Sequence, residues 1–491
     1  MRRLFIGVLL AAAGVCVTPA AAWAHAELLS SQPGYGDRLP AAPAEVRLEF
    51  STAVDLTGGR FSLERRAGPA TALDRPAPAS SDRRTVAIPL PPRLADGAYT
   101  LVWYLLGSDG HLMAGEVSFS VGAGGTAAGA APAGPTPAVP APASPASAVR
   151  RLGPGIAGPA LRYDASPAPP PAMPQRTRVA IALSTPQAVV RFVDDASLAV
   201  LLGGGFFLAA VWADGSRERR ARRLLWWALA ISAAATLLTF GLTAAGLRGV
   251  GALDALRPSV MATVLGTRLA RVLGARAAFL ALTSVALAML TLGRERAVRS
   301  RWWRGLAGVA AGGILVTHAV LGHAGSEGAA ARLAFLVHLA GVSVWLGGLV
   351  FLAAVVLPRR RPEEVRVVLP RFSDLAFTAV AAMVVAGAVM VTRVVPRLSA
   401  LPQTGYGRVL LVKLGLVALL LLAAQQARTF TERRLVRDSA RLRPLVGAVG
   451  VELALAVLIL TSTAVLVGRV PPNARSTRNQ SSVTAPKGPP R

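Results

Sequence analysis

Eight long apolar segments constrain this 491-residue chain more than any other feature of its sequence. Each is long enough to cross a lipid bilayer as a helix. Because backbone polar groups find no partner in hydrocarbon, each segment is expected to form an α-helix. The sequence therefore predicts an all-α polytopic membrane domain of eight transmembrane helices over residues 190–470. The segments lie at about 190–212, 223–247, 269–292, 303–323, 332–357, 374–395, 408–427 and 443–468.

The formal charge of +28 invites a nucleic-acid interpretation, but its distribution argues against one. Much of the surplus is Arg in alternate short loops, at 217–223, 294–301, 359–366 and 433–441. Cytoplasmic loops carry this bias, so these loops are expected inside and the chain is expected to be a multi-pass protein of the plasma membrane. The lipid bilayer is the predicted partner, and nucleic acid is not.

The first 24 residues have the pattern of a secretory signal peptide. Basic residues at the start precede an apolar run, and Ala22-Trp23-Ala24 forms an A-x-A cleavage sequence. Cleavage there removes Cys16, the chain's one cysteine, and makes His25 the new N-terminus. The mature chain then has no thiolate, so any metal must bind His, carboxylate, amine or Met.

Residues 25–122 alternate apolar and polar positions between Gly/Pro turns. Examples are the runs 45–50, 85–88, 99–103 and 116–121. This period of two predicts an all-β, immunoglobulin-like sandwich. An Ala/Pro/Gly-rich linker over 123–189 is expected to be the flexible and only connection to the helices, and residues 471–491 are expected to be a disordered tail.

An internal repeat relates the first four apolar segments to the last four. Two motifs carry it: a Gly-Gly pair followed by Phe-Leu-Ala-Ala-Val, and a basic residue followed five positions later by another. The first occurs at 203–211 and 347–355, and the second at Arg271/Arg276 and Arg408/Lys413. Because each half has an even number of spans, both halves are expected to point the same way through the membrane.

His25 and the sequence Ser108-Asp109-Gly110-His111 form a candidate copper site. An N-terminal His offers its α-amine and a ring nitrogen to one metal ion, and His111 can supply a third nitrogen. Asp109 can add an oxygen ligand. The alternative is that His25 merely follows a cleavage site and that Asp-Gly is an ordinary turn. The A-x-A sequence directly before His25 favours a Cu(II) site of His25, Asp109 and His111.

The same region resembles the CopC family of copper-resistance proteins. The resemblance rests on His25-Ala26-Glu27-Leu28, on the run from Pro43 to Ser51, on Gly97 to Trp103, and on residues 108–111. It implies a Cu(II) site of His25, His111 and Asp109. Some members also carry a Met-rich Cu(I) site, but Met113 is the one methionine in this region, so that second site is not expected.

The other three histidines, His318, His323 and His338, lie at one end of the fourth and fifth apolar segments. Intramembrane ionisable groups are costly, so the three are predicted to form a copper entry site at the outer face. His318 and His323 are five positions apart, about 140° around a helix, so either Gly322 loosens the last turn and they converge, or they act in sequence. The alternative is that the three side chains only form hydrogen bonds between helices.

Five further charged positions have less definite roles. Asp194 and Asp195 either attract a cation or are hydrated residues of the interface. Arg276 and Lys413 are expected to extend toward the outer surface. Glu452, in the last segment, is expected to need a partner that the sequence does not name.

Residues 190–470 resemble the CopD family of copper-resistance membrane proteins. The resemblance rests on Gly322-His323-Ala324, on His338 with residues 344–349, on 371–373, and on Tyr406 to Lys413. CopC–CopD fusions have this domain order. The resemblance implies neither the direction of transport nor the number of metal ions.

The predicted function is copper handling without enzymatic activity, in which Cu(II) is bound outside the cytoplasm and passed to or across the membrane. An extracytoplasmic copper donor is a further expected partner. Sequestration for resistance without transport is the main alternative. A haem redox protein would use His318 and His338 as axial ligands. An oxygen-activating histidine brace is disfavoured by Asp109 and by the small size of the domain.

Overall fold

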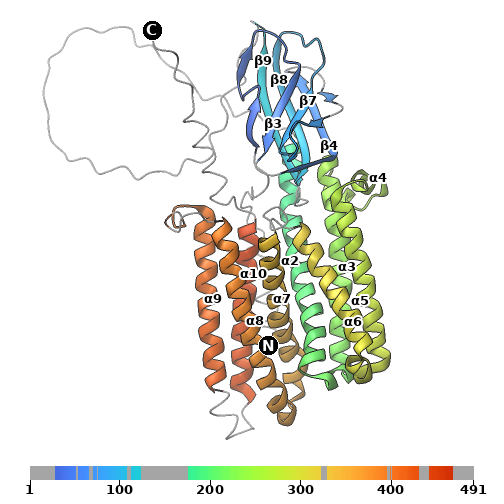
Figure 1. Ribbon diagram of the computed structural model, residues 1–491, viewed down its shortest axis with the longest axis vertical. Coiled ribbons are helices and arrows are strands. Elements are labelled where there is room, and N and C mark those ends of the chain that lie inside the picture. Colours follow the sequence, from blue (N-terminus) through green and yellow to red (C-terminus); the bar gives the residue numbers. More distant parts are fainter. Residues whose placement is uncertain are drawn as a thin grey trace, which may run out of the picture.

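The computed structural model comprises a β-domain and a bundle of long helices (Figure 1). The predicted signal peptide, most of the linker and the tail lie outside the residues that the structure describes. The described residues are 28–50, 53–65, 70–73, 76–107, 112–122, 175–321, 329–394, 399, 401–430 and 442–467.

The β-domain is a sandwich of two sheets, so the predicted all-β fold is confirmed. One sheet has the order β1-β3-β7-β6 and the other β2-β9-β8-β4-β5. The strands are β1 (Leu28–Gln32), β2 (Asp37–Leu39), β3 (Glu45–Phe50), β4 (Val54–Arg65), β5 (Ala70–Leu73), β6 (Ala77–Pro78), β7 (Thr85–Pro89), β8 (Gly97–Gly107) and β9 (Leu112–Val121).

The alternation in sequence becomes the two faces of each strand. In β3, Val46, Leu48 and Phe50 are fully buried, whereas the residues between them face outward. Phe50 meets Trp103 of β8 edge to face, with ring centroids 5.1 Å apart, across the space between the two sheets. The Tyr99 hydroxyl donates to the Ala95 carbonyl at 2.6 Å, as in the tyrosine corner of immunoglobulin-like folds.

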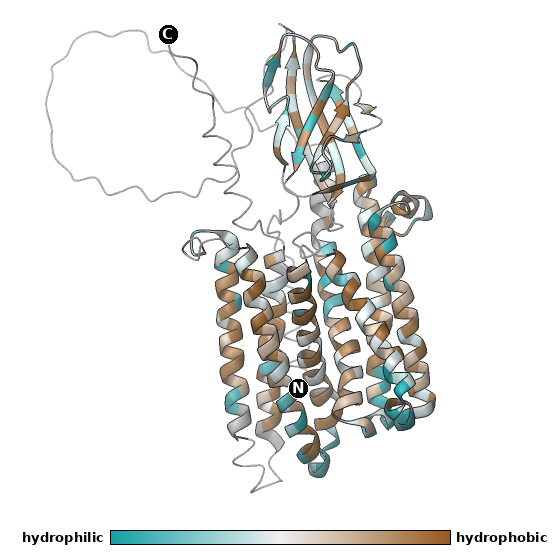
Figure 2. Ribbon diagram, in the orientation of Figure 1, coloured by the Kyte–Doolittle hydropathy of each residue, from teal (hydrophilic) through white to brown (hydrophobic). Residues whose placement is uncertain are grey.

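Among the described residues, eight helices are long and apolar enough to span a membrane, as predicted. The long helices are α2 (Gln175–Ala210), α3 (Arg219–Arg248), α5 (Arg268–Arg299), α6 (Arg301–Leu321), α7 (Ala329–Phe351), α8 (Pro362–Val394), α9 (Gly405–Phe430) and α10 (Leu442–Val467). Shorter elements are η1 (Ala213–Arg217), η2 (Ala252–Asp254), α4 (Pro258–Met261), η3 (Ala262–Val264), η5 (Leu352–Val356) and η6 (Leu357–Arg359). Hydrophobic residues dominate the helices along most of their length (Figure 2). The first helix begins at Gln175, inside the region expected to be linker.

Helices α2 and α7 cross at two glycines that the repeat makes equivalent. A Cβ on Gly203 would collide with the carbonyl oxygen of Ser343, and a Cβ on Gly347 would collide with that of Ala199. The same shift of 144 positions relates Ala199 to Ser343 and Gly203 to Gly347. The two halves therefore meet at a pseudo-symmetric crossing, where glycine allows close approach of the backbones.

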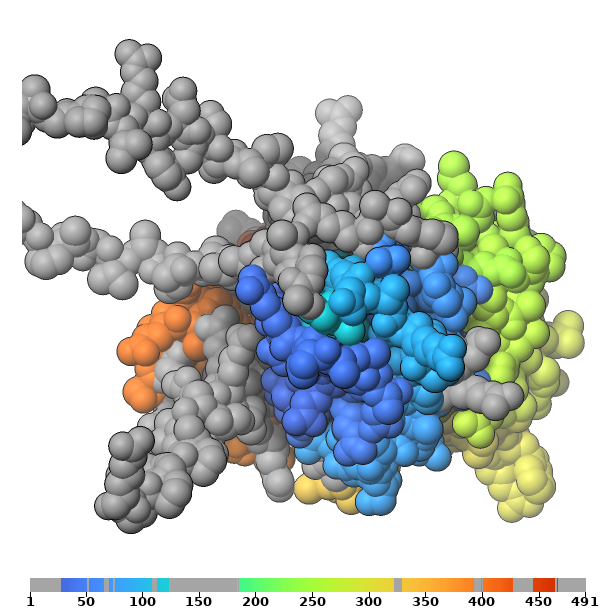
Figure 3. Space-filling model, turned by 90° about the horizontal axis from the view of Figure 1, so that it is seen from above, coloured from blue at the N-terminus to red at the C-terminus, as the bar shows by residue number. Residues whose placement is uncertain are grey.

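The β-domain rests directly on the helices, so the linker is not its only connection. Seen from above, the β-domain lies over part of the helical bundle (Figure 3). Leu106, at the end of β8, is buried in one hydrophobic cluster with Leu183 of α2, Leu247 of α3 and Leu269 of α5.

Candidate functional site

The residues predicted to bind Cu(II) in the β-domain, His25, Asp109 and His111, lie outside the described residues. The two strands that flank 108–111, β8 and β9, are described up to Gly107 and from Leu112. Leu106 belongs to the cluster formed with the membrane helices. The strand that leads into the Asp109–His111 segment therefore ends at the surface where the two domains touch.

A polar contact also fixes the β-domain on the bundle. The Asp55 carboxylate of β4 accepts a hydrogen bond from the backbone N–H of Arg268 at 3.1 Å. Arg268 is the first residue of α5, and Thr267 caps the same helix by accepting from the Ala270 N–H at 3.2 Å. A carboxylate is favourable there, since the first N–H groups of a helix lack partners and carry partial positive charge.

Below this interface, one buried ion pair links three helices. Arg276 of α5 donates to Asp194 of α2 at 2.5 Å, and both side chains are about 95% buried. Ser232 of α3 donates to the other carboxylate oxygen of Asp194 at 2.9 Å. Arg276 was expected to extend to the surface, but this contact holds it inside the bundle. Pairing with hydrogen bonds to both oxygens offsets the cost of burying the two charges.

The adjacent residue, Asp195, binds the first membrane histidine. Its carboxylate lies 3.0 Å from Nε2 of His318 on α6, and Asp195 is 37% exposed. The carboxylate accepts, so Nε2 carries the hydrogen, and in the neutral ring Nδ1 holds the lone pair. Nδ1 is buried and has no hydrogen-bond partner among the described residues. Together with the ion pair, this contact links α2, α3, α5 and α6, the four long helices of the first half.

His338 of α7 has a different setting. Its Nδ1 donates to the backbone carbonyl of Met383 on α8 at 3.0 Å, so its Nε2 holds the lone pair. Gly387, one turn along α8, leaves room beside the ring. Lys413 of α9 is a charged neighbour of this histidine and forms no ion pair within the described part of the chain.

The structure gives His318 and His338 separate partners. His323 lies outside the described residues. Within the described ranges, no three His, Cys, Asp or Glu side chains form a group that could hold a metal ion. Convergence of the three histidines on one ion therefore stays a prediction.

The repeat aligns these two settings. The shift of 144 positions that relates the α2–α7 crossing also relates Asp194 to His338. Thr267 and Thr404 cap α5 and α9 in the same way, 137 positions apart, and the same shift relates Arg276 to Lys413. The Asp194–Arg276 ion pair of the first half therefore corresponds to His338 and Lys413 in the second half.

Sequence reasoning missed Ser232, the Asp55 cap and the Asp194–Arg276 pair. The pairing of Asp195 with His318 was also not predicted. A signal existed for one of these contacts, because the repeat motif already set Arg276 beside Lys413 as equivalent positions. Two charged residues at matching places within apolar helices indicate buried positions with partners.

Family comparisons decide the identity of both parts. The CopC domain matches residues 28–122, the copper resistance protein D-like N-terminal domain matches 182–333, and copper resistance protein D matches 366–466. The chain belongs to the CopC–CopD fusions. The CopC domain is thus the β-sandwich, and the CopD-type region is the helical bundle.

Individual relatives cover the chain in part or almost whole. "Copper transport protein CutJ" of Bacillus subtilis is 24% identical over 90% of this chain and 75% of its own length. "Protein YobA" of Escherichia coli K12 is 36% identical over 21% of this chain and 84% of its own length. Among solved structures, CopC from Methylosinus trichosporium OB3b is 26% identical, covering 20% of this chain and 93% of its own, with a TM-score of 0.18.

Proposed function

We propose that this protein captures Cu(II) outside the cytoplasm in its CopC domain and passes copper to the CopD-type helices for acquisition. His25 contributes its α-amine and ring, His111 a third nitrogen, and Asp109 an oxygen. Nitrogen-rich sites of this kind suit Cu(II). The copper is cargo, delivered by an extracytoplasmic donor or taken directly from the medium.

The observation that carries the proposal is the contact between the two domains. Leu106 is three residues from Asp109 and is buried among residues of α2, α3 and α5. The Asp55 contact with the start of α5 holds the domain in that position. The CopC domain would therefore not need to move far on its linker to deliver a copper ion from the Asp109–His111 segment.

In the membrane, we propose that His318, His323 and His338 receive the copper. The two described histidines each use one ring nitrogen in a hydrogen bond, to Asp195 and to the Met383 carbonyl. Metal-binding histidines are commonly oriented in this way, with the other nitrogen kept for the metal.

The charges around the two histidines suggest an order. Asp195 places a carboxylate beside His318, whereas Lys413 places an ammonium near His338. An anion attracts copper and a cation repels it, so His318 is the first acceptor and His338 a later one.

Copper measurements in cells test the direction of transport. A deletion strain grown under copper limitation is expected to take up less radiolabelled copper than its parent. Unchanged uptake would reject acquisition. Sensitivity of that strain to excess copper, with unchanged uptake, would support sequestration instead.

The amine ligand is tested with the full chain. A variant cleaved so that one residue still precedes His25 moves the α-amine away from the ring, and its Cu(II) affinity is expected to fall by orders of magnitude. Equal affinity of the two forms would exclude the amine as a ligand. His111→Ala is expected to weaken binding more than Asp109→Ala, because it removes a nitrogen.

The membrane histidines are tested by paired substitutions. His318→Gln and His338→Gln each keep a hydrogen-bonding side chain, so a structural role predicts normal function in both. Metal ligation predicts lost copper uptake at normal protein abundance, with Cu(II) binding by the CopC domain intact. Rescue by Gln at both positions would reject ligation.

A further inference from the structure

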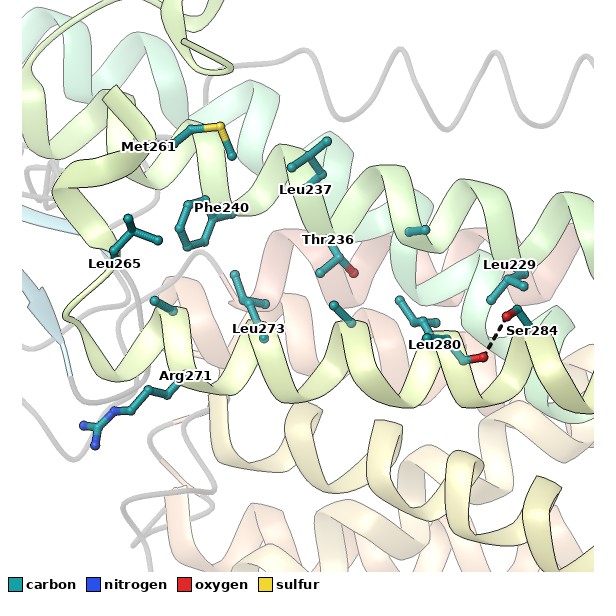
Figure 4. Close-up of a pocket in the computed structure, with 15 residues that line it drawn as sticks. Leu229, Thr236, Leu237, Phe240, Met261, Leu265, Arg271, Leu273, Leu280 and Ser284 are labelled. Atoms are coloured by element: carbon teal, nitrogen blue, oxygen red, sulfur yellow. Dashed lines mark hydrogen bonds between the residues drawn. The ribbon is translucent and has the colours of Figure 1, made fainter. Parts of the chain in front are cut away.

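A groove of about 630 Å³ runs along the surface of the CopD-type region between α3 and α5 (Figure 4). Leu237 of α3 lies on its wall and is 49% exposed, and Leu265, at its outer end, is 65% exposed. Exposed apolar side chains on membrane-spanning helices face lipid. The groove is therefore open to the bilayer.

The groove exists because α5 presents small side chains to it. Gly274, Ala277, Ala281 and Ser284 recur at spacings of three and four, so they share one face of the helix. A Cβ added at Gly274 would meet nothing within 4 Å. Small residues usually let two helices approach closely, but here they leave a gap that the protein does not fill.

Arg271 stands at the end of the groove nearest the β-domain. It lies in the first turn of α5, its side chain is exposed, and Figure 4 shows the guanidinium directed away from the apolar lining. No ion pair is recorded for it within the described ranges. The site thus combines a long apolar groove with a cation at one end, close to the N-terminus of α5.

We propose that this groove binds one anionic phospholipid from the leaflet on the β-domain side. An acyl chain lies along Gly274 to Ser284, and the phosphate contacts Arg271. Guanidinium groups bind phosphate by paired, charge-assisted hydrogen bonds, and an apolar chain gains free energy by covering exposed hydrocarbon. A lipid is the occupant that supplies both groups at this position.

The bound lipid would also support the domain interface. Met261 and Leu265, at the outer end of the groove, belong to the segment that joins α3 to α5. The CopC domain touches that segment, where Gly58 lies against the Thr263 carbonyl. A lipid in the groove therefore packs against the segment on which the CopC domain rests.

Native mass spectrometry of the full chain, released from vesicles of phosphatidylglycerol and phosphatidylcholine, tests the proposal. Wild-type protein is expected to retain one phosphatidylglycerol in preference to phosphatidylcholine. Arg271→Gln should reduce that preference about tenfold, the effect of losing one charge-assisted contact of about 1.4 kcal/mol. Arg408→Gln is the control, because Arg408 is the equivalent exposed residue on α9. Equal retention of the two lipids, or equal losses in the two variants, would overturn the proposal.

The apolar part is tested separately by filling the groove. Gly274→Leu has space for its side chain and should displace the lipid, so retention of phosphatidylglycerol is expected to disappear. Gly312→Leu on α6 is the control, since a Cβ there also meets nothing within 4 Å but Gly312 does not line the groove. Unchanged retention in Gly274→Leu would show that no acyl chain occupies the groove.

Discussion

The two halves of the CopD-type region share a framework but differ in the charged and ionisable side chains at equivalent positions. Each half starts its third long helix with a threonine cap, Thr267 or Thr404, and the halves meet at the Gly203–Gly347 crossing. At equivalent positions, however, the first half has the Asp194–Arg276 ion pair and the second has His338 near Lys413. The two halves thus share their backbone arrangement at these positions but carry side chains of different chemistry.

This difference distinguishes charged residues that stabilise the fold from residues that are proposed to bind copper. The first half neutralises its buried arginine and uses the neighbouring acid, Asp195, to orient His318. The second half holds His338 by a backbone carbonyl and has no carboxylate recorded beside Lys413 in its described residues. In the proposed order of transfer, the first half therefore attracts the copper ion and the second half releases it.

The largest expected effect is on stability, from removal of the cation of the first half, and the matching change in the second half is its comparison. Arg276→Met leaves Asp194 buried without its partner, which costs about 3–5 kcal/mol. Lys413→Met removes a half-buried cation that forms no ion pair within the described residues, and is expected to cost little or to stabilise. Thermal unfolding of the purified protein in detergent measures both.

The double substitution Asp194→Leu with Arg276→Met is the control for that comparison. It removes both charges and should recover most of the lost stability, as found when apolar residues replace buried ion pairs. Equal destabilisation by Arg276→Met and Lys413→Met would mean that the two halves do not differ in this respect.

A second comparison asks whether the crossing is symmetric. Gly203→Ala and Gly347→Ala each place a methyl group against a backbone carbonyl of the other helix, so both are expected to cost about 1–3 kcal/mol. Gly205→Ala is the control. Its Cβ meets nothing within 4 Å, and alanine is the better helix former, so this change should be neutral or stabilising by up to about 1 kcal/mol. Unequal costs at Gly203 and Gly347 would show that the crossing is not shared equally.

Much of the fold could be predicted because it follows from period and length. The run 45–50 alternates strictly and forms β3, and the eight apolar segments form eight helices. The start of α2 was harder to place. Residues 175–189 include Arg176, Arg178 and Pro186, so no uninterrupted apolar run marks where the helix begins.

The contacts within the site could not be predicted from the sequence in the same way. Asp194 and Arg276 are 82 positions apart, and no local pattern shows which faces of α2 and α5 meet. The position of the CopC domain was missed for a similar reason. A long linker suggested a free tether, whereas the contact of Asp55 with α5 depends on the shapes of two folded domains.

The smallest expected effect concerns the contact between Asp55 of the CopC domain and the N-terminus of α5. Asp55→Ala removes a carboxylate from the exposed N-terminus of α5 and should cost about 0.3–1 kcal/mol, the usual effect of an acid near a helix N-terminus. Thr267→Ala removes the other cap and should cost about 1 kcal/mol, as should Thr404→Ala at the equivalent cap of α9. Hydrogen exchange distinguishes the two kinds of loss. Asp55→Ala is expected to speed exchange both at the start of α5 and at the end of β8 near Leu106, because docking of the CopC domain weakens as a whole. Thr267→Ala should affect α5 more than β8. If Asp55→Ala leaves exchange near Leu106 unchanged, Asp55 only caps the helix, and apolar packing alone holds the CopC domain on the first half.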